Sequence, residues 1–195
     1  KKQQAREASQ SLNVSLQRML DAPQAARTIA SLYYEREMFG RARPVYTQLA
    51  AELHPKREKA LAMWRAGMCL WRGGHPELAR KKLQAVIDEY PHTAAEHRAR
   101  LGLTGMAVGK SLPEVRMEHI EVYRTVAVSS PERVVREEAS LKRIIALYQL
   151  GELEEAADEL TLFLAHFAAG PLRYEAQSLL VELVPQLVPA LFAQE

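Results

Sequence analysis

Apolar residues recur along this chain at spacings of three and four, and β-branched residues do not alternate with polar ones over any useful length. Spacings of three and four place side chains on one face of an α-helix. Gly and Pro fall between the patterned segments, where they interrupt helices. The pattern therefore predicts an all-α chain.

The apolar pattern predicts a polar helix over 1–21, four helical hairpins and a last helix over 172–193. The hairpins pair 24–38 with 41–53, 57–72 with 76–89, 93–109 with 113–128, and 132–149 with 153–167. We therefore expect an N-terminal polar helical segment over 1–22, a repeat array over 23–170 and an apolar C-terminal capping helix over 171–195.

Small residues recur at a fixed period. Ala79 and Ala156 each follow a turn glycine by five residues. Ala42 precedes Ala79 by 37 residues, and Ala79 precedes Ala156 by 77, which is about two such steps. A period of this length indicates a helical repeat array, in which neighbouring hairpins stack because one hairpin cannot bury both of its faces.

The residues at these repeated positions resemble tetratricopeptide repeats. The second hairpin has the fullest set: Ala66, Gly67, Leu70, Gly74, Ala79, Leu83, Val86 and Pro91. The fourth hairpin matches in part, at Leu147, Gly151, Ala156, Leu160 and Phe163. The first also matches in part, at Ala30, Tyr33, Ala42, Tyr46 and Leu49. The third hairpin departs from the pattern, since His119 stands where a small residue is expected. The resemblance implies a right-handed α-solenoid that acts as a non-catalytic scaffold for protein binding.

The segment 89–95 resembles the junctions of bacterial cell-envelope tetratricopeptide proteins, including outer-membrane assembly lipoproteins. This resemblance favours the bacterial periplasm or envelope over the cytoplasm. The chain begins at Lys1 without an initiator methionine, so we expect it to be a processed or trimmed fragment of something longer. The scaffold is expected to act as part of a larger assembly or of a larger protein.

Charge gives no reason to expect a nucleic-acid partner. Lys plus Arg number 26 and Asp plus Glu 24, so the formal net charge is only +2. No apolar run reaches the length that crosses a bilayer, so we expect no direct membrane insertion. Cys69 is the only cysteine, which excludes an internal disulfide.

No pattern of catalytic or ligand-binding residues emerges. The stretch 102–111 ends in Gly-Lys-Ser, but Thr104 stands where a phosphate-binding loop requires its first glycine. No two of the six histidines have the four-residue spacing of a helical metal site. Cys69 has no activating neighbour in the sequence. We therefore expect no enzymatic activity, no cofactor and no metal.

The family resemblance implies that the first helix of each hairpin lines a groove. The positions that project into it are Arg27, Ser31, Tyr34, Trp64, Met68, Trp71, Arg72, Arg100, Thr104, Leu141, Ile145 and Tyr148. They lack the Lys/Asn/Arg clamp with which one branch of the family holds a terminal carboxylate, so a groove for a helix or an extended segment is expected. The alternative is that Trp64 and Trp71 pack between adjacent repeats.

The last helix carries an unusually broad apolar stripe, interrupted by Pro185 and Pro189. The prolines remove backbone donors and are expected to bend the helix. The simpler interpretation is a cap folded against the fourth hairpin. The alternative is that the chain is a structural module that self-associates through this helix.

Overall fold

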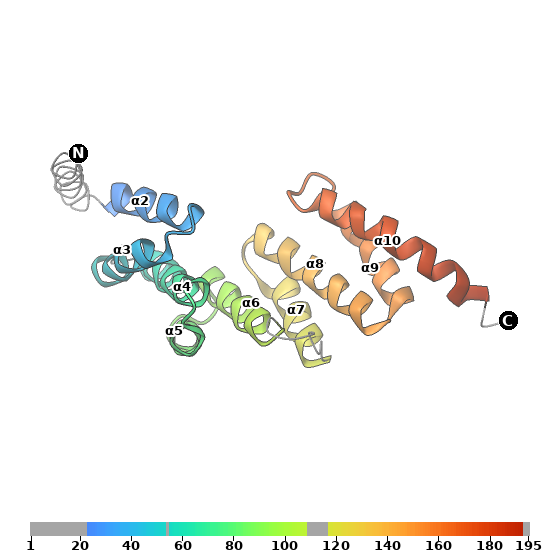
Figure 1. Cartoon of the computed structure of the whole chain (residues 1–195), viewed down its shortest axis with the longest axis horizontal. Helices are drawn as coiled ribbons and strands as arrows, with labels where there is room; N and C mark the ends of the chain where they lie inside the picture. The colour runs from blue at the N-terminus through green and yellow to red at the C-terminus, as the bar shows by residue number, and fades with distance from the viewer. Residues whose placement is uncertain (1–22, 54, 109–116, 193–195) are drawn as a thin grey trace, which may run out of the picture. The chain divides into compact units, whose positions relative to one another are not determined.

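The computed structural model describes residues 23–53, 55–108 and 117–192, and within these ranges it contains nine helices and no strand (Figure 1). The helices are α2 (Pro23–Glu35), α3 (Phe39–Glu52), α4 (Lys56–Arg72), α5 (Pro76–Glu89), α6 (Ala94–Val108), α7 (Met117–Ser129), α8 (Arg133–Leu150), α9 (Leu153–His166) and α10 (Arg173–Phe192). The all-α prediction is confirmed, and each predicted hairpin is present. The helix expected over 1–21 lies outside the described residues.

The chain divides into two compact units, Lys1–Tyr90 and Pro91–Glu195. The first unit contains α2 to α5, and the second contains α6 to α10. Within each unit, every helix packs against the next one along the chain. None of the described helices has both the length and the apolar character that a membrane crossing requires.

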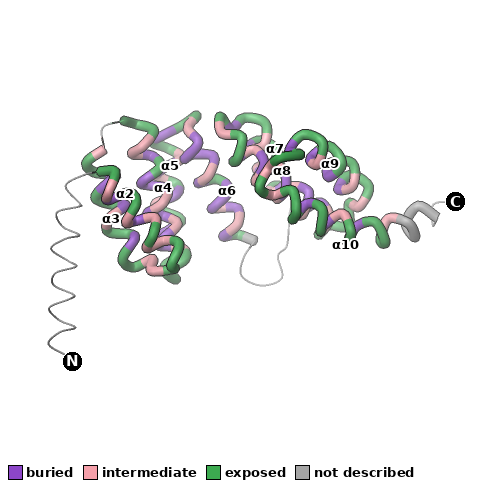
Figure 2. The backbone as a smooth tube through the Cα atoms, turned by 90° about the horizontal axis from the view of Figure 1, so that it is seen from above, coloured by how far each residue is buried: buried purple, intermediate pink, exposed green. Residues whose placement is uncertain are grey.

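Small residues let the helices of the first unit approach closely. Ala42 and Ala79 are fully buried, and Gly67 of α4 faces Leu83 of α5. A Cβ atom at Gly67 would lie 2.8 Å from Leu83 Cδ2, closer than carbon atoms can pack. The buried residues of α4 include Ala66, Gly67 and Leu70 of the repeat pattern. Figure 2 colours the buried parts of the backbone purple.

Two glycines end the first helices of the second and fourth hairpins. Gly74 and Gly151 have φ values of +83° and +84°, a left-handed conformation that side chains with a Cβ atom disfavour. Each is followed by a backbone N–H that bonds back across the last turn, from His75 to Leu70 and from Glu152 to Leu147. This Schellman arrangement satisfies carbonyls at the helix end and sets the tight turn.

The last helix closes the core of the second unit. Ala176, Leu179 and Leu183 of α10 are buried in one cluster with side chains from α7, α8 and α9. Tyr174, Val181 and Val184 remain exposed, the first two at 82% and 74%. The described part of α10 thus packs into the core of the second unit, while part of its apolar stripe faces solvent.

Candidate protein-binding surface

An ion pair joins the N-terminal halves of α2 and α4 in the first unit. Arg27 Nη2 lies 2.6 Å from Glu58 Oε2, and both side chains are 44% exposed. Such an exposed pair contributes little to stability. The structure thus places Arg27 at a solvent-accessible position, and its role in a groove stays a prediction.

Ser31 lies one turn further along α2 and bonds to the second helix of its hairpin. Its hydroxyl shares a hydrogen bond of 3.2 Å with the hydroxyl of Tyr46, which is only 3% exposed. Burial raises the pKa of Tyr46, and the bond to Ser31 partly offsets that effect. Ser31 is half-buried and acts first as a partner of Tyr46.

An arginine lies between aromatic rings near the C-terminal end of α2. Arg65 Cζ is 5.0 Å from the ring centroid of Tyr34 and 4.8 Å from that of Trp64. The ring of Phe39 meets Tyr34 edge-on at a centroid distance of 5.3 Å. Cation–π contacts of this kind hold a guanidinium in a fixed orientation.

Trp71 and Arg72 extend this cluster at the C-terminal end of α4. Arg72 Cζ lies 5.5 Å from the ring centroid of Trp71. Burial raises the pKa of Tyr34, while the nearby Arg65 and Arg72 partly offset the shift, so the phenol is neutral near pH 7. Tyr34, Phe39, Arg65, Trp71 and Arg72 are together called the aromatic–arginine surface below.

The aromatic–arginine surface is accessible, whereas the first tryptophan of α4 is not. Arg72 is exposed, the other four members are half-buried, and Met68 is half-buried as well. Trp64 is only 8% exposed and lies in the core of the unit. The alternative interpretation, in which a tryptophan packs between helices, therefore describes Trp64 better than Trp71.

The sequence did not point to Phe39 or Arg65. Phe39 begins a second helix, outside the set of first helices that was expected to line the groove. Arg65 follows Trp64 directly, on a stretch of α4 with many buried residues. The charged residue within that buried stretch was the available signal.

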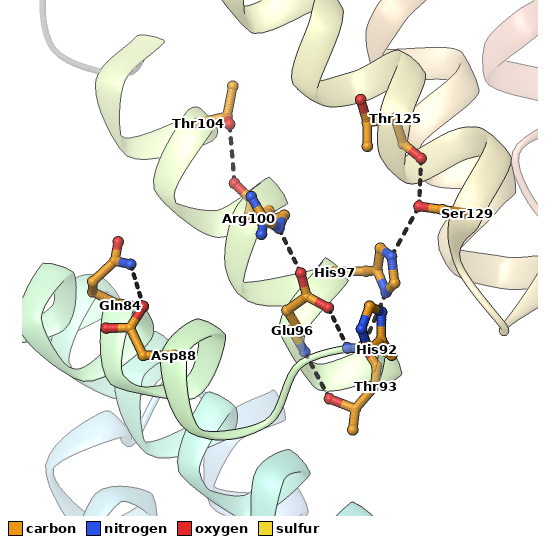
Figure 3. Close-up of polar contacts among 10 residues, drawn as sticks. All are labelled: Gln84, Asp88, His92, Thr93, Glu96, His97, Arg100, Thr104, Thr125 and Ser129. Atoms are coloured by element: carbon orange, nitrogen blue, oxygen red, sulfur yellow. Dashed lines mark hydrogen bonds and ion pairs between the residues drawn. The ribbon is translucent and has the colours of Figure 1, made fainter.

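In the second unit, Arg100 and Thr104 belong to a polar network on α6 (Figure 3). Arg100 Nε donates to Glu96 Oε1 at 2.6 Å, and the Thr104 hydroxyl donates to the Arg100 carbonyl at 2.9 Å. The Arg100 side chain is 43% exposed, whereas Thr104 is buried at 7%. Of these two predicted groove residues, only Arg100 offers its side chain to solvent.

The same network caps the N-terminus of α6 and ties it to α7. Glu96 accepts from the His92 amide at 2.7 Å, and the Glu96 amide donates to the Thr93 hydroxyl at 3.1 Å. His97 donates from Nδ1 to the Thr93 carbonyl, and its Nε2 lies 3.0 Å from Ser129 Oγ. Burial acts to raise the pKa of Glu96, but the hydrogen bonds and nearby positive charges hold it below its usual value. The network is therefore primarily structural.

The fourth hairpin corrects one predicted groove residue. Leu141 is 2% exposed and belongs to the core cluster of the second unit, so its side chain cannot contact a partner in this conformation. Ile145 and Tyr148 are half-buried against the same cluster. The Tyr148 hydroxyl accepts a hydrogen bond of 2.6 Å from Gln186 of α10. The last helix thus engages a side that the sequence assigned to the groove.

Two features that could support catalysis, a reactive thiol and a metal-binding cluster, can be checked in the described residues. Burial raises the pKa of Cys69 to about 11, an effect that Arg65 and Arg43 reduce only in part, so the thiol is neutral. The parts of the chain that the structure describes contain no group of three His, Cys, Asp or Glu side chains arranged to hold a metal ion. Gly102 and Thr104 lie within α6, and the Gly-Lys-Ser end of that stretch lies outside the described residues.

Comparison with known proteins agrees with the helix pairs. A tetratricopeptide repeat family model matches residues 27–94, which run from α2 to the first residue of α6. No curated protein matches the chain. The match covers the hairpins that carry the aromatic–arginine surface, and the described helices of the second unit continue the same helix-turn-helix pattern. The chain is therefore an all-α helical repeat protein, and its residues 27–94 match the tetratricopeptide repeat family.

Proposed function

We propose that this protein is a non-catalytic scaffold that binds a segment of another protein at the aromatic–arginine surface, as part of a larger assembly or of a longer protein. Tetratricopeptide repeats generally mediate protein–protein interactions. The proposal adds the place of contact, which the family alone does not specify.

The observation that carries the proposal is the partial exposure of aromatic rings beside arginines. Trp, Tyr and Arg side chains supply most of the binding energy at protein interfaces. Arg65 is already held over the Tyr34 ring, so binding would immobilise little additional side chain.

The chemistry of this surface favours a segment with aromatic and acidic side chains. Arg65 and Arg72 supply two guanidinium groups, and Arg27 is held only by an exposed ion pair with Glu58. A guanidinium forms paired hydrogen bonds with a carboxylate, and the Trp71 ring offers a face for stacking. Either a helix or an extended strand of the partner could present such groups.

The test compares three full-length proteins in quantitative capture of partners from the native source. Trp71→Ala with Arg72→Ala removes ring and charge from the surface. Arg80→Ala is the matched control, since Arg80 is an exposed α5 residue held only by a long pair with Glu77. We expect the double variant to lose the partners that the wild type and the control retain, with unchanged helicity by circular dichroism. Equal capture by all three proteins would refute the proposed surface.

Self-association through α10 is a second candidate, favoured by the exposure of Val181, Val184 and Tyr174. Burying these side chains in a dimer would remove apolar area from water. Sedimentation at several concentrations tests it, with Val181→Glu as the disrupting variant. A wild-type monomer at every concentration would exclude this candidate.

We also propose that the protein lies in the bacterial envelope, which the resemblance of the segment 89–95 to envelope-protein junctions supports. Fractionation of source cells, with detection of the chain in the periplasmic or membrane fraction, tests it. Recovery in the cytoplasmic fraction alone would refute it.

A further inference from the structure

A groove of about 350 Å³ lies within the second unit, bordered by α7, α8 and α9. Its floor consists of Ile144, Phe163 and Phe167, which are at most 5% exposed. A concave site of this size with an apolar floor can accept a large side chain from a ligand.

The walls of this groove are apolar side chains that the fold leaves in solvent. Val128 on α7 is 80% exposed, and Leu162 on α9 is 68% exposed. Single exposed apolar residues are common on protein surfaces, but these two border the same concave site. A side chain inserted between them would remove both walls and itself from water.

The charges on the lining are unbalanced. Three arginines and one glutamate border the groove: Arg124, Arg136, Arg143 and Glu159. Their sum is a formal charge of +2. Arg143 is neutralised, because it contacts both Glu155 and Glu159. The positive character therefore comes from the other two arginines.

Arg136 and Arg124 differ in how they are held. Arg136 Nη1 donates to the Ser130 carbonyl at 2.7 Å, which orients the guanidinium without neutralising it. Among the described residues, no carboxylate forms an ion pair with Arg136. Arg124 is 59% exposed and pairs only with Glu121 of its own helix, an interaction worth little in water.

A further guanidinium, that of Arg133, contacts two residues of the groove lining. Arg133 Cζ lies 5.8 Å from the ring centroid of Phe167, and its Nη2 is 3.5 Å from the His166 carbonyl. Both of these neighbours line the groove. Arg133 therefore adds positive charge next to Phe167, a residue of the apolar floor.

We propose that this groove binds an acidic protein segment that inserts a large apolar side chain. The apolar side chain lies between Val128 and Leu162 above Phe163, and neighbouring carboxylates pair with Arg136 and Arg124. The site lies within the second unit alone, so this proposal is independent of the proposal that the aromatic–arginine surface binds a partner. A free aryl or alkyl carboxylate shares the same chemistry and is distinguished below.

The test uses the full chain and fluorescence polarisation of a fluorescein-labelled synthetic peptide, made of Glu and Asp around a central Leu-Phe pair. We expect Arg136→Gln and Leu162→Ser each to weaken binding about tenfold or more, since each removes a charged hydrogen bond or buried apolar contact. Lys142→Gln is the matched control, because it removes a positive charge from α8 at a half-exposed residue outside the lining. This control should bind as the wild type does.

Two further probes examine the ligand chemistry. Peptides with Gln and Asn in place of the acids, or with Ser in place of Leu-Phe, should bind about tenfold more weakly than the original. Phenylpropionate should compete only weakly, because it carries a single carboxylate. If it competes as well as the peptide does, the site belongs to a small acid and not to a protein segment.

Several outcomes would overturn the proposal. The first is that the wild type does not bind the peptide. The second is that Arg136→Gln and Leu162→Ser bind it as tightly as the wild type does. The third is that only Trp71→Ala abolishes binding. Sedimentation with vesicles of phosphatidylserine and phosphatidylcholine, without peptide binding, would assign the groove to a membrane surface instead. Circular dichroism of each variant confirms that weaker binding does not reflect unfolding.

Discussion

Replacement of Gly170 by alanine provides a direct test of the packing around α10. Gly170 lies in the turn between α9 and α10, against the carboxylate of Glu137 on α8. A Cβ atom there would lie 2.6 Å from Glu137 Oε2 and closer still to the other carboxylate oxygen. Either the turn or the carboxylate must therefore move.

The carboxylate cannot move without loss. Glu137 is 2% exposed, and its Oε1 accepts the Leu172 amide proton at 3.0 Å, just before α10 begins. Breaking that bond leaves a buried polar group unsatisfied, which costs about 1–3 kcal/mol. Overpacking adds about 1–3 kcal/mol. Together these two effects should lower the free energy of unfolding of Gly170→Ala by about 2–6 kcal/mol, a large part of the ~5–15 kcal/mol typical of a domain.

The measurement is urea unfolding followed by circular dichroism, arranged as a double-mutant cycle with Glu137→Ala. In the Glu137→Ala background the clash is absent, so Gly170→Ala should cost less than about 1 kcal/mol there. Gly40→Ala is the control, because a Cβ atom at this α3 glycine meets nothing within 4 Å. Strict additivity of the two substitutions, or a negligible effect of Gly170→Ala alone, would refute the reasoning.

Three further predictions concern the two cores and the titrating groups. Gly67→Ala should destabilise the first unit by about 1–3 kcal/mol, because its Cβ atom would overlap Leu83. Urea unfolding followed by the fluorescence of the α4 tryptophans should show this loss, and an unchanged urea midpoint would contradict the packing. Cys69 should resist iodoacetamide at pH 8 in the native protein and react after unfolding, because burial raises its pKa to about 11; rapid native labelling would show that the thiol is accessible. Folding lowers the pKa of Glu96, so the ionised carboxylate stabilises the protein above the pKa of the unfolded state, and this stabilisation disappears as pH falls through the pKa of the folded state. Glu96→Gln should therefore reduce the loss of unfolding free energy at acidic pH. An unchanged loss in the variant would exclude Glu96 as its source.

The helices were predictable because their signals are local. Apolar spacing gave the buried faces, and the glycines at 74 and 151 marked helix ends that require a left-handed residue. The core residues Ala42, Ala79 and Leu83 were predictable, because close helix packing requires small and large side chains at regular spacings along the sequence.

The candidate surface was only partly predictable. Periodicity identifies the helix that lines a groove, but it does not give the side-chain contacts between separate hairpins. Arg65 meets Tyr34 because two different helices pack in a particular register. Leu141 was assigned to the groove wrongly, since its face packs into the core cluster of the second unit, which α10 helps to complete. Such contacts depend on the stacking of distant segments and leave no local pattern.

The single buried thiol on α4 makes local opening of the first unit measurable. Cys69 is 2% exposed and is the only cysteine in the chain, so every labelled molecule reports one position. When reclosing is faster than reaction, the labelling rate relative to that of the unfolded chain equals the fraction of time in which α4 is exposed, and each tenfold slowing corresponds to about 1.4 kcal/mol of opening free energy. Reaction rates measured with and without a bound partner would then show how much the partner holds this helix closed, without any engineered probe.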